Sequence, residues 1–178
     1  MKISVYIATS LDGFIARENG DLDWLPGSEG QSDGEDYGYQ QFMDSVDTLV
    51  MGRNTYEMVL SFGKWPYGEK RVFVLSSQEI EISEFLAGIV ESRSSSLAKL
   101  VDELRIAGAQ HIYIDGGNTI QGFLNAGLID EMIITRIPVL IGSGIPLFGT
   151  LDHDQKLRHI QTSSFANGLV QSKYEVLK

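Results

Sequence analysis

The sequence contains no cysteine, and this one absence removes several kinds of chemistry. Disulfide bonds, thiol nucleophiles and cysteine-based zinc sites are all excluded. Histidine is nearly as scarce, since only His111, His153 and His159 are present and no two of them have the spacing of metal ligands. We therefore expect an activity that uses neither a thiol nor a bound metal.

Positive charge is also in short supply. The 178 residues hold 14 Lys and Arg against 24 Asp and Glu, and the net charge of −10 argues against a general nucleic-acid surface. An acidic protein can still bind an anionic cofactor through backbone amides and a few local cations. No apolar run is long enough for a membrane span and no signal peptide follows Met1, so we expect a cytoplasmic protein that acts on a small molecule.

The chain does contain a regular alternation of short β-branched runs and helical patterns. Strands are expected over residues 3–9, 48–51, 72–75, 111–114 and 130–139, and helices over residues 36–45, 53–60, 97–107 and 119–128. Near the C-terminus, Asn167-Gly168 between two strand-like runs is typical of a β-hairpin. This order predicts one α/β domain over residues 1–178, with a mostly parallel sheet flanked by helices and a C-terminal antiparallel hairpin.

Three predicted strands end in turns that suit an anion: GRNT (residues 52–55), SS (residues 76–77) and GGNTI (residues 116–120). The C-terminal ends of parallel strands share one edge of the sheet, and ligands bind there. A helix starts at two of these turns, where free N–H groups and the helix dipole favour phosphate. An ordinary tight turn is the simpler explanation of each, but three on one edge fit a dinucleotide. No GxGxxG motif follows the first strand, which disfavours a Rossmann domain.

A long polar loop, residues 17–34, lies between the first strand and the first helix. Trp24 either pins this loop to the rest of the protein or lines a ligand pocket, and the sequence favours neither. Glu35 and Asp36 at the start of the helix also have two interpretations. They complement the helix dipole, or one carboxylate points into a pocket.

Several motifs, taken in chain order, resemble one family. They are SLDGFIA (residues 10–16), MGRNTYE (residues 51–57), VLSS (residues 74–77) and DGGNT (residues 115–119), followed by Asp130-Glu131 and Thr135. Together they resemble the dihydrofolate reductase fold and, more closely, the reductase domain of bacterial bifunctional riboflavin-biosynthesis proteins and its stand-alone relatives. The resemblance extends over nearly the whole chain.

This resemblance implies an NADPH-dependent reductase whose cofactor contacts lie in the three turns and near the first strand. The implied phosphate contacts are Gly52, Arg53, Asn54 and Thr55 at one helix start, Ser76 and Ser77 at the adenosine 2′-phosphate, and Gly116, Gly117, Asn118, Thr119 and Ile120 at the pyrophosphate. Ala8 and Ile15 would border the nicotinamide ring. The loop around Trp24 would close over that ring and exclude water.

For the substrate, the resemblance implies an acid at the start of the first helix, and the family's interval before Gly52 places it at Asp36, with Glu35 as its neighbour. Trp24 and Thr135 are the other expected substrate contacts. Folate reductases have an arginine before the third main strand that binds a carboxylate tail. This chain has Glu69 at the matching position, although a shift of two residues would restore Arg71.

We therefore expect a pyrimidine- or pterin-like substrate, most closely that of a 5-amino-6-(5-phosphoribosylamino)uracil reductase. A substrate phosphate would need a cation such as Lys64, Lys70 or Arg71, unless these are ordinary surface charges. Dihydrofolate reductase activity and a non-catalytic NADP-binding protein remain the alternatives. The resemblance also implies a homodimer.

Overall fold

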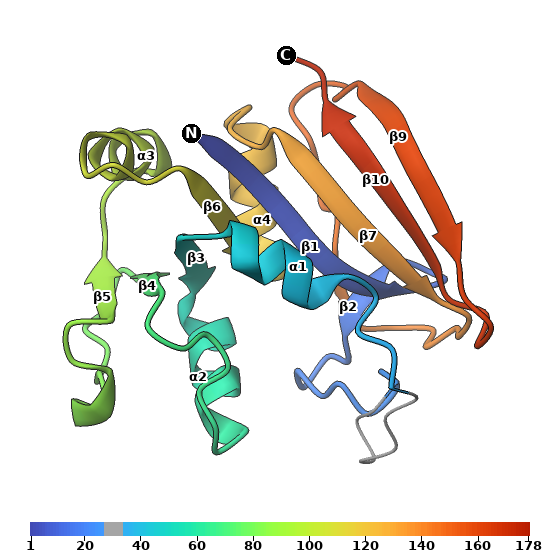
Figure 1. The fold of residues 1–178 in the computed structure, drawn as a ribbon, viewed down its shortest axis with the longest axis horizontal. Helices are drawn as coiled ribbons and strands as arrows, with labels where there is room; N and C mark the ends of the chain where they lie inside the picture. Colours follow the sequence, from blue (N-terminus) through green and yellow to red (C-terminus); the bar gives the residue numbers. More distant parts are fainter. Residues whose placement is uncertain (27–33) are drawn as a thin grey trace.

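Eight strands form one sheet with the order β5-β4-β3-β6-β1-β7-β10-β9 (Figure 1). It is seen in a computed structural model that describes residues 1–26 and 34–178. In sheet order the strands are β5 (Val90–Arg93), β4 (Arg71–Leu75), β3 (Thr48–Gly52), β6 (His111–Asp115), β1 (Lys2–Ser10), β7 (Glu131–Ile137), β10 (Val170–Val176) and β9 (Leu157–Ser164). The strands from β5 to β7 are parallel, and β10 and β9 continue the sheet in antiparallel pairing.

Helices cover both faces of this sheet. They are α1 (Tyr39–Ser45), α2 (Arg53–Ser61), α3 (Leu97–Ile106) and α4 (Gly117–Asn125), and a short 3₁₀ turn, η1 (Glu84–Leu86), precedes β5. Leu49 and Met51 of β3 pack in one core with α1 and α2, whereas Val50 packs in the other core with α3 and α4. The central strands are buried on both faces, which explains their continuous apolar sequences. In the described part of the chain, no helix is long and apolar enough to cross a membrane.

The predicted fold class is confirmed, including the C-terminal hairpin, but two helix starts differ from the prediction. α4 begins at Gly117 rather than at residue 119. α1 begins at Tyr39 rather than at residue 36, because Tyr37 and Gly38 have φ values of 56° and 85°, which an α-helix does not contain. Asp36 therefore lies before the helix instead of in its first turn.

A second, two-stranded sheet pairs β2 (Phe14–Ala16) with β8 (Ile145–Pro146). Gly144 lies so close to β2 that a Cβ on it would collide with the carbonyl oxygen of Ala16. This close approach brings Ile15 and Ile145 together beside the C-terminal end of β1, where both line the cavity described next.

Candidate active site

A cavity of about 520 Å³ opens at the C-terminal edge of the parallel strands. Ala8, Gly52, Leu75 and Asp115, from the ends of β1, β3, β4 and β6, contribute to its lining. The first residues of α2 and α4 line it as well. This is the edge at which the sequence predicts a ligand.

Two helices begin side by side at this cavity, and no side chain in the described residues caps either of them. Gly52 is the N-cap of α2, and Gly116 is the N-cap of α4. The two turns pack together: a Cβ on Gly52 would lie 3.0 Å from Oγ1 of Thr119, and a Cβ on Gly116 would collide with Oγ1 of Thr55. Gly116 also has a φ of 90°, which residues with side chains rarely adopt. The N–H groups that begin both helices can therefore meet one anionic ligand.

The third predicted turn follows β4 and lies beside the cavity rather than in its wall. The Ser76 hydroxyl donates to the Gln78 carbonyl oxygen at 2.7 Å and accepts from the Gln78 N–H at 3.1 Å. Arg53 links this turn to the start of α2, because its Nη1 donates to Oε1 of Gln78 at 2.5 Å while its Nε donates to Glu57 at 2.6 Å. Ser77 is exposed just beyond. The three turns thus form one polar edge, with Arg53 as its cation.

An apolar wall adjoins the start of α4. Ala8, Ile15 and Ile145 form it. A Cβ on Gly117 would lie 2.9 Å from Cδ1 of Ile15 and 3.3 Å from the carbonyl oxygen of Pro146, so a larger residue there would displace β2 and β8. The cavity therefore places an apolar surface directly next to the anion-binding edge.

The end of the cavity away from the helix starts is apolar. Met58 and Phe62 line it from farther along α2, and Leu22 and Leu25 are apolar lining residues from the loop. Tyr67 and Asp115 also line the cavity, with Asp115 beside Met51 and directly before the start of α4. Leu22 and Leu25 belong to the long polar loop, so part of that loop closes this end of the cavity.

Asp115, the last residue of β6, is the acidic residue of the cavity lining. Its Oδ1 accepts the N–H of Gly116 at 2.8 Å, and its Oδ2 lies 3.4 Å from the Tyr67 hydroxyl, which donates to it. Burial raises the pKa of the Asp115 carboxyl, and these two hydrogen bonds only partly oppose the rise. Burial raises the pKa of the Tyr67 hydroxyl as well. Asp115 can therefore hold a proton at a higher pH than an ordinary aspartic acid.

The structure places the predicted acid, Asp36, outside the lining of this cavity. Its carboxylate is exposed and accepts the N–H groups of Gly38 and Gln40 at 2.9 and 3.1 Å, and these bonds lower its pKa. Oε1 of Glu35 accepts the N–H of Tyr37 at 3.3 Å. Both carboxylates thus accept backbone N–H groups at the approach to α1 and lie before its first turn rather than within it. Their roles toward substrate stay predictions.

Three other predicted site residues also lie outside the lining. Ile120 is fully buried in the core, and its N–H donates to the carbonyl of Gly116 at 2.9 Å, so neither group faces the cavity. Thr135 is buried on β7 and accepts a hydrogen bond from Gln171 at 3.0 Å. Trp24 is half-buried, and its indole N–H has no partner among the described residues. Substrate contacts at Trp24 and Thr135 stay predictions.

The sequence interpretation missed the acid that does line the cavity. A carboxylate that ends a buried strand directly before a glycine turn is itself a signal, because parallel strands point their C-terminal residues toward the ligand. Asp115 has this position, but the sequence interpretation gave a role to the residues that follow it, beginning with Gly116 and Gly117, and none to Asp115 itself. Tyr67 gives no comparable signal, since it lies in a loop between α2 and β4.

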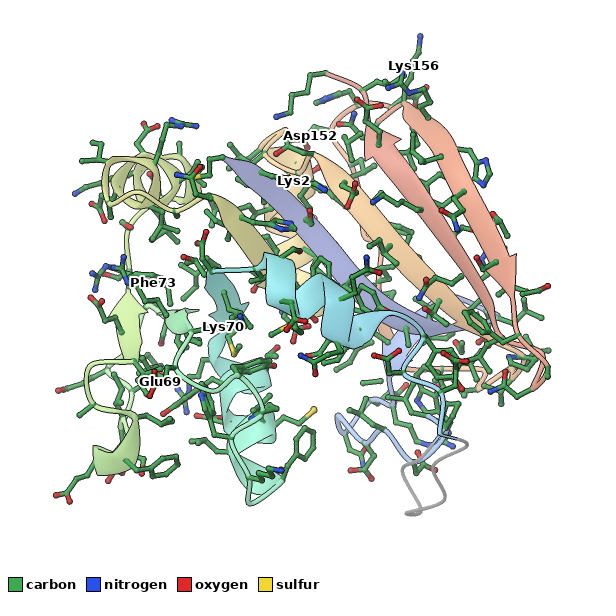
Figure 2. The ribbon with its side chains drawn as sticks, viewed as in Figure 1. Lys2, Glu69, Lys70, Phe73, Asp152 and Lys156 are labelled. Atoms are coloured by element: carbon green, nitrogen blue, oxygen red, sulfur yellow. The ribbon has the colours of Figure 1, made fainter. Side chains whose placement is uncertain are left out.

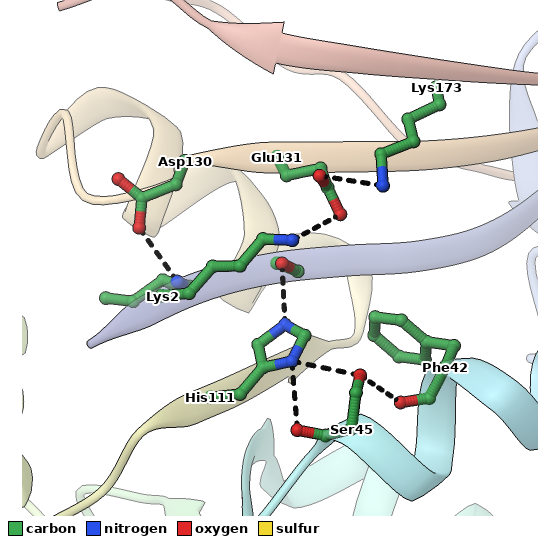
Figure 3. Close-up of polar contacts among 9 residues, drawn as sticks. Lys2, Phe42, Ser45, His111, Asp130, Glu131 and Lys173 are labelled. Atoms are coloured by element: carbon green, nitrogen blue, oxygen red, sulfur yellow. Dashed lines mark hydrogen bonds and ion pairs between the residues drawn. The ribbon is translucent and has the colours of Figure 1, made fainter. Parts of the chain in front are cut away.

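A second hollow, of about 350 Å³, lies between α1 and the N-terminal halves of β1 and β7. Its charged groups already bind one another (Figure 3). Glu131 accepts hydrogen bonds from Lys2 and Lys173, each at 2.9 Å. The two ring nitrogens of His111 lie 2.8 Å from the Ser4 hydroxyl and 3.1 Å from the Ser45 carbonyl. We therefore place the functional site in the larger cavity.

Comparisons with known proteins show what this chain is similar to. The family model of the RibD C-terminal domain matches residues 1–171. The uncharacterised protein YwjB of Bacillus subtilis (strain 168) is 40% identical over 171 residues, which make up 94% of each chain. A solved structure from Shewanella sp. PV-4, provisionally assigned to riboflavin biosynthesis, is 43% identical over 100% of both chains with a TM-score of 0.91.

A more distant structure shares the fold alone. It is the diaminohydroxyphosphoribosylaminopyrimidine deaminase/5-amino-6-(5-phosphoribosylamino)uracil reductase of Thermotoga maritima, which is 13% identical with a TM-score of 0.74 over 99% of this chain and 56% of its own. The predicted dihydrofolate reductase-like fold is thereby confirmed.

Proposed function

Because this chain belongs to the RibD C-terminal domain family, a family of reductase domains, we propose that it is an NADPH-dependent reductase of a pyrimidine- or pterin-like small molecule. The observation that carries the proposal is the pair of uncapped helix starts that open, together with Asp115, into one cavity. One end of this cavity suits a polyanion and the other suits a flat, mostly apolar ring.

The residues of the cavity fit NADPH. The N–H groups at the starts of α2 and α4 suit its diphosphate, and the Arg53 guanidinium, bonded to Gln78 in the turn that holds Ser77, suits the adenosine 2′-phosphate. Ala8, Ile15 and Ile145 supply an apolar wall for the nicotinamide. When bound, NADPH supplies a hydride to the substrate.

The chain's own residues supply position, dryness and a proton. A C=N bond that gains a hydride at carbon also needs a proton at nitrogen. The Asp115 carboxyl, with its raised pKa, can hold that proton inside the cavity. Leu22, Leu25 and Met58 are partly buried and add apolar surface to the same cavity, which reduces its water. We assign the acid role to Asp115, in competition with the Asp36 predicted from the sequence.

A titration with NADPH and NADH tests the cofactor assignment. We expect quenching of protein fluorescence at much lower concentrations of NADPH than of NADH, and we expect pterins, folates or ribosylaminopyrimidines to consume the near-ultraviolet absorbance of NADPH. Absence of NADPH binding would refute the proposal. Tight binding without turnover across these substrates would identify a non-catalytic NADP-binding protein instead.

The predicted homodimer remains a proposal with its own test. β9 forms one edge of the sheet and is exposed along almost its whole length, so a second chain has room to pair there. We expect light scattering to give twice the 19.7 kDa mass of one chain.

A further inference from the structure

The distribution of cations restricts what the far end of the cavity can bind. All 14 Lys and Arg fall within the described residues, because residues 27–33 contain none. Of these 14 side chains, Arg53 alone lines the cavity. Its guanidinium lies at the polar edge, bonded to Glu57 and Gln78, on the side that the proposed function gives to the cofactor.

The cations that the sequence offers for a substrate phosphate are not in the cavity lining. The Lys70 ammonium donates to the Val46 carbonyl at 2.8 Å beside β3. Arg71 lies over the Phe73 ring, 5.0 Å from its centroid, and 3.7 Å from Glu91. Figure 2 shows Lys70 and Phe73 near β4, and it shows Lys2 and Lys156 at the edge of the sheet opposite α2.

The residues around the far end add negative charge instead. Residues 17–26, which include the lining residues Leu22 and Leu25, contain three Asp and Glu against the cation Arg17, whose guanidinium is bonded to Asp23 at 2.6 and 2.9 Å. Asp115 lies inside the cavity itself. A dianionic phosphate would meet apolar walls, a carboxyl group and a negative field, and none of these replaces its lost hydration.

The other phosphate-binding groups of the cavity are the N–H groups and the Asn and Thr side chains in the first turns of α2 and α4, and both helices are uncapped. The proposed function assigns both to NADPH, so none is left for the substrate. We propose, resting on that function, that the substrate is a planar heterocycle without phosphate or carboxylate, neutral or cationic at pH 7. Its C=N bond gains a hydride at carbon and a proton at nitrogen, and NADPH is oxidised to NADP⁺.

Matched pairs of ligands test this inference by binding alone. The NADP⁺-loaded protein is titrated calorimetrically with two pairs of ligands. The first pair is a ribosylaminopyrimidine and its 5′-phosphate. The second pair is a pterin without a glutamate tail and dihydrofolate, which carries that tail. We expect the uncharged member of at least one pair to bind at least about ten-fold more tightly than its anionic partner. Tighter binding of both anionic members, or binding of neither uncharged one, would overturn the inference.

Failure of the inference is distinguishable from failure of the proposed function. If the protein does not bind NADP⁺, the cofactor assignment is wrong. If it binds NADP⁺ and prefers phosphorylated ligands, only the substrate class is wrong. In that case Lys64, the exposed cation two residues after Phe62, is the expected ligand, and Lys64→Gln should abolish the preference.

An added cation provides the converse test. Phe62 lines the cavity but is 57% exposed, so Phe62→Arg should fold. We expect it to tighten binding of the phosphorylated ribosylaminopyrimidine by about ten-fold or more. Phe85→Arg is the matched control, since Phe85 is 65% exposed on η1 and is not part of the cavity lining. Equal effects of the two variants would contradict the placement of the substrate beside Phe62.

Discussion

The two edges of the parallel sheet use polar groups in opposite ways. At the N-terminal edge, Glu131 binds Lys2 and Lys173, and the carboxylate of Asp47 accepts the N–H groups of Gln110 and His111 at 2.8 and 3.0 Å. At the C-terminal edge, no side chain of the described residues caps α2 or α4. Polar side chains hold the chain together at the first edge, whereas at the second edge two helix starts are left without a side-chain cap and can meet a ligand.

The direction of the chain explains this difference. In a parallel βα unit each strand delivers the N-terminus of the following helix to the same edge, so positive dipole ends collect there. Side chains could neutralise them, but Gly52 and Gly116 occupy both N-cap positions. The comparison predicts that changes at the C-terminal edge remove function and that changes at the N-terminal edge cost only stability.

The largest effect is expected for Gly116→Ala. The new Cβ would collide with Oγ1 of Thr55, and its φ of 90° is unfavourable for alanine. We expect a loss of about 3 kcal/mol in the free energy of unfolding. NADPH affinity should fall roughly 100-fold, as expected when two hydrogen bonds to a charged phosphate are lost. Urea unfolding and fluorescence titration measure the two effects.

Gly127→Ala is the matched control for this variant. Gly127 has a similarly positive φ of 64°, but a Cβ there would have no atom within 4 Å. It should cost about 1 kcal/mol of stability and leave NADPH affinity unchanged. Equal losses of affinity in the two variants would show that backbone strain, and not the contact between the two turns, shapes the site.

The second prediction concerns the acid. Asp115→Asn keeps the shape of the side chain and removes its proton, so turnover should fall roughly 100-fold while NADPH affinity stays within about two-fold. Steady-state kinetics and cofactor titration measure the two. Asp36→Asn is the decisive comparison, because its carboxylate is bonded to the backbone before α1. If Asp36→Asn lowers turnover more than Asp115→Asn does, the acid is Asp36, as the sequence predicts.

The pH dependence follows from the same carboxyl group. Because burial raises the pKa of Asp115 in the folded protein, its protonated form persists to higher pH and is lost as the pH rises through that pKa. Turnover should therefore decline as the pH rises through this raised pKa, and the stability contributed by the protonated form should decline over the same range. In Asp115→Asn both declines should be absent. An unchanged pH profile in that variant would exclude Asp115 as the proton donor.

The two glycine turns were predictable because their signals are local. At Gly52 and Gly116, a strand pattern ends in glycine and a helical pattern follows at once. This pattern can be recognised without knowledge of the fold. Ile120 was predicted to contact the pyrophosphate, but the apolar spacing of Ile120, Phe123 and Leu124 favours the buried side of α4, where the structure has it. For Ile120, the helical spacing of apolar residues is a stronger signal than its position next to the glycine turn.

Other features depend on how distant segments meet. The assignment of an acid to Asp36 required counting across a loop with no periodicity, and the left-handed residues Tyr37 and Gly38 shift the start of α1. Leu22 and Leu25 line the cavity together with Met58 of α2, and a Cβ on Gly20 in the same loop would lie 3.1 Å from Cε of Met58. Such tertiary contacts leave no pattern in a single sequence.

The smallest effect is expected at the N-terminal edge. Burial alone would raise the pKa of Glu131, but the hydrogen bonds from Lys2 and Lys173 outweigh burial and lower it. Its ionised form therefore stabilises the fold above the unfolded pKa, and this contribution is lost as the pH falls through the lower, folded pKa. Glu131→Gln should cost about 1 kcal/mol at pH 7, since both lysines are partly exposed and solvent screens the ion pairs. Urea unfolding at pH 7 and at acidic pH should show the difference from wild type shrinking as the pH falls.

NADPH affinity and turnover of Glu131→Gln should match wild type, because Glu131 lies at the edge opposite the helix starts. A loss of turnover without a loss of stability would mean that the smaller hollow takes part in the reaction, and the division between the two edges would be wrong.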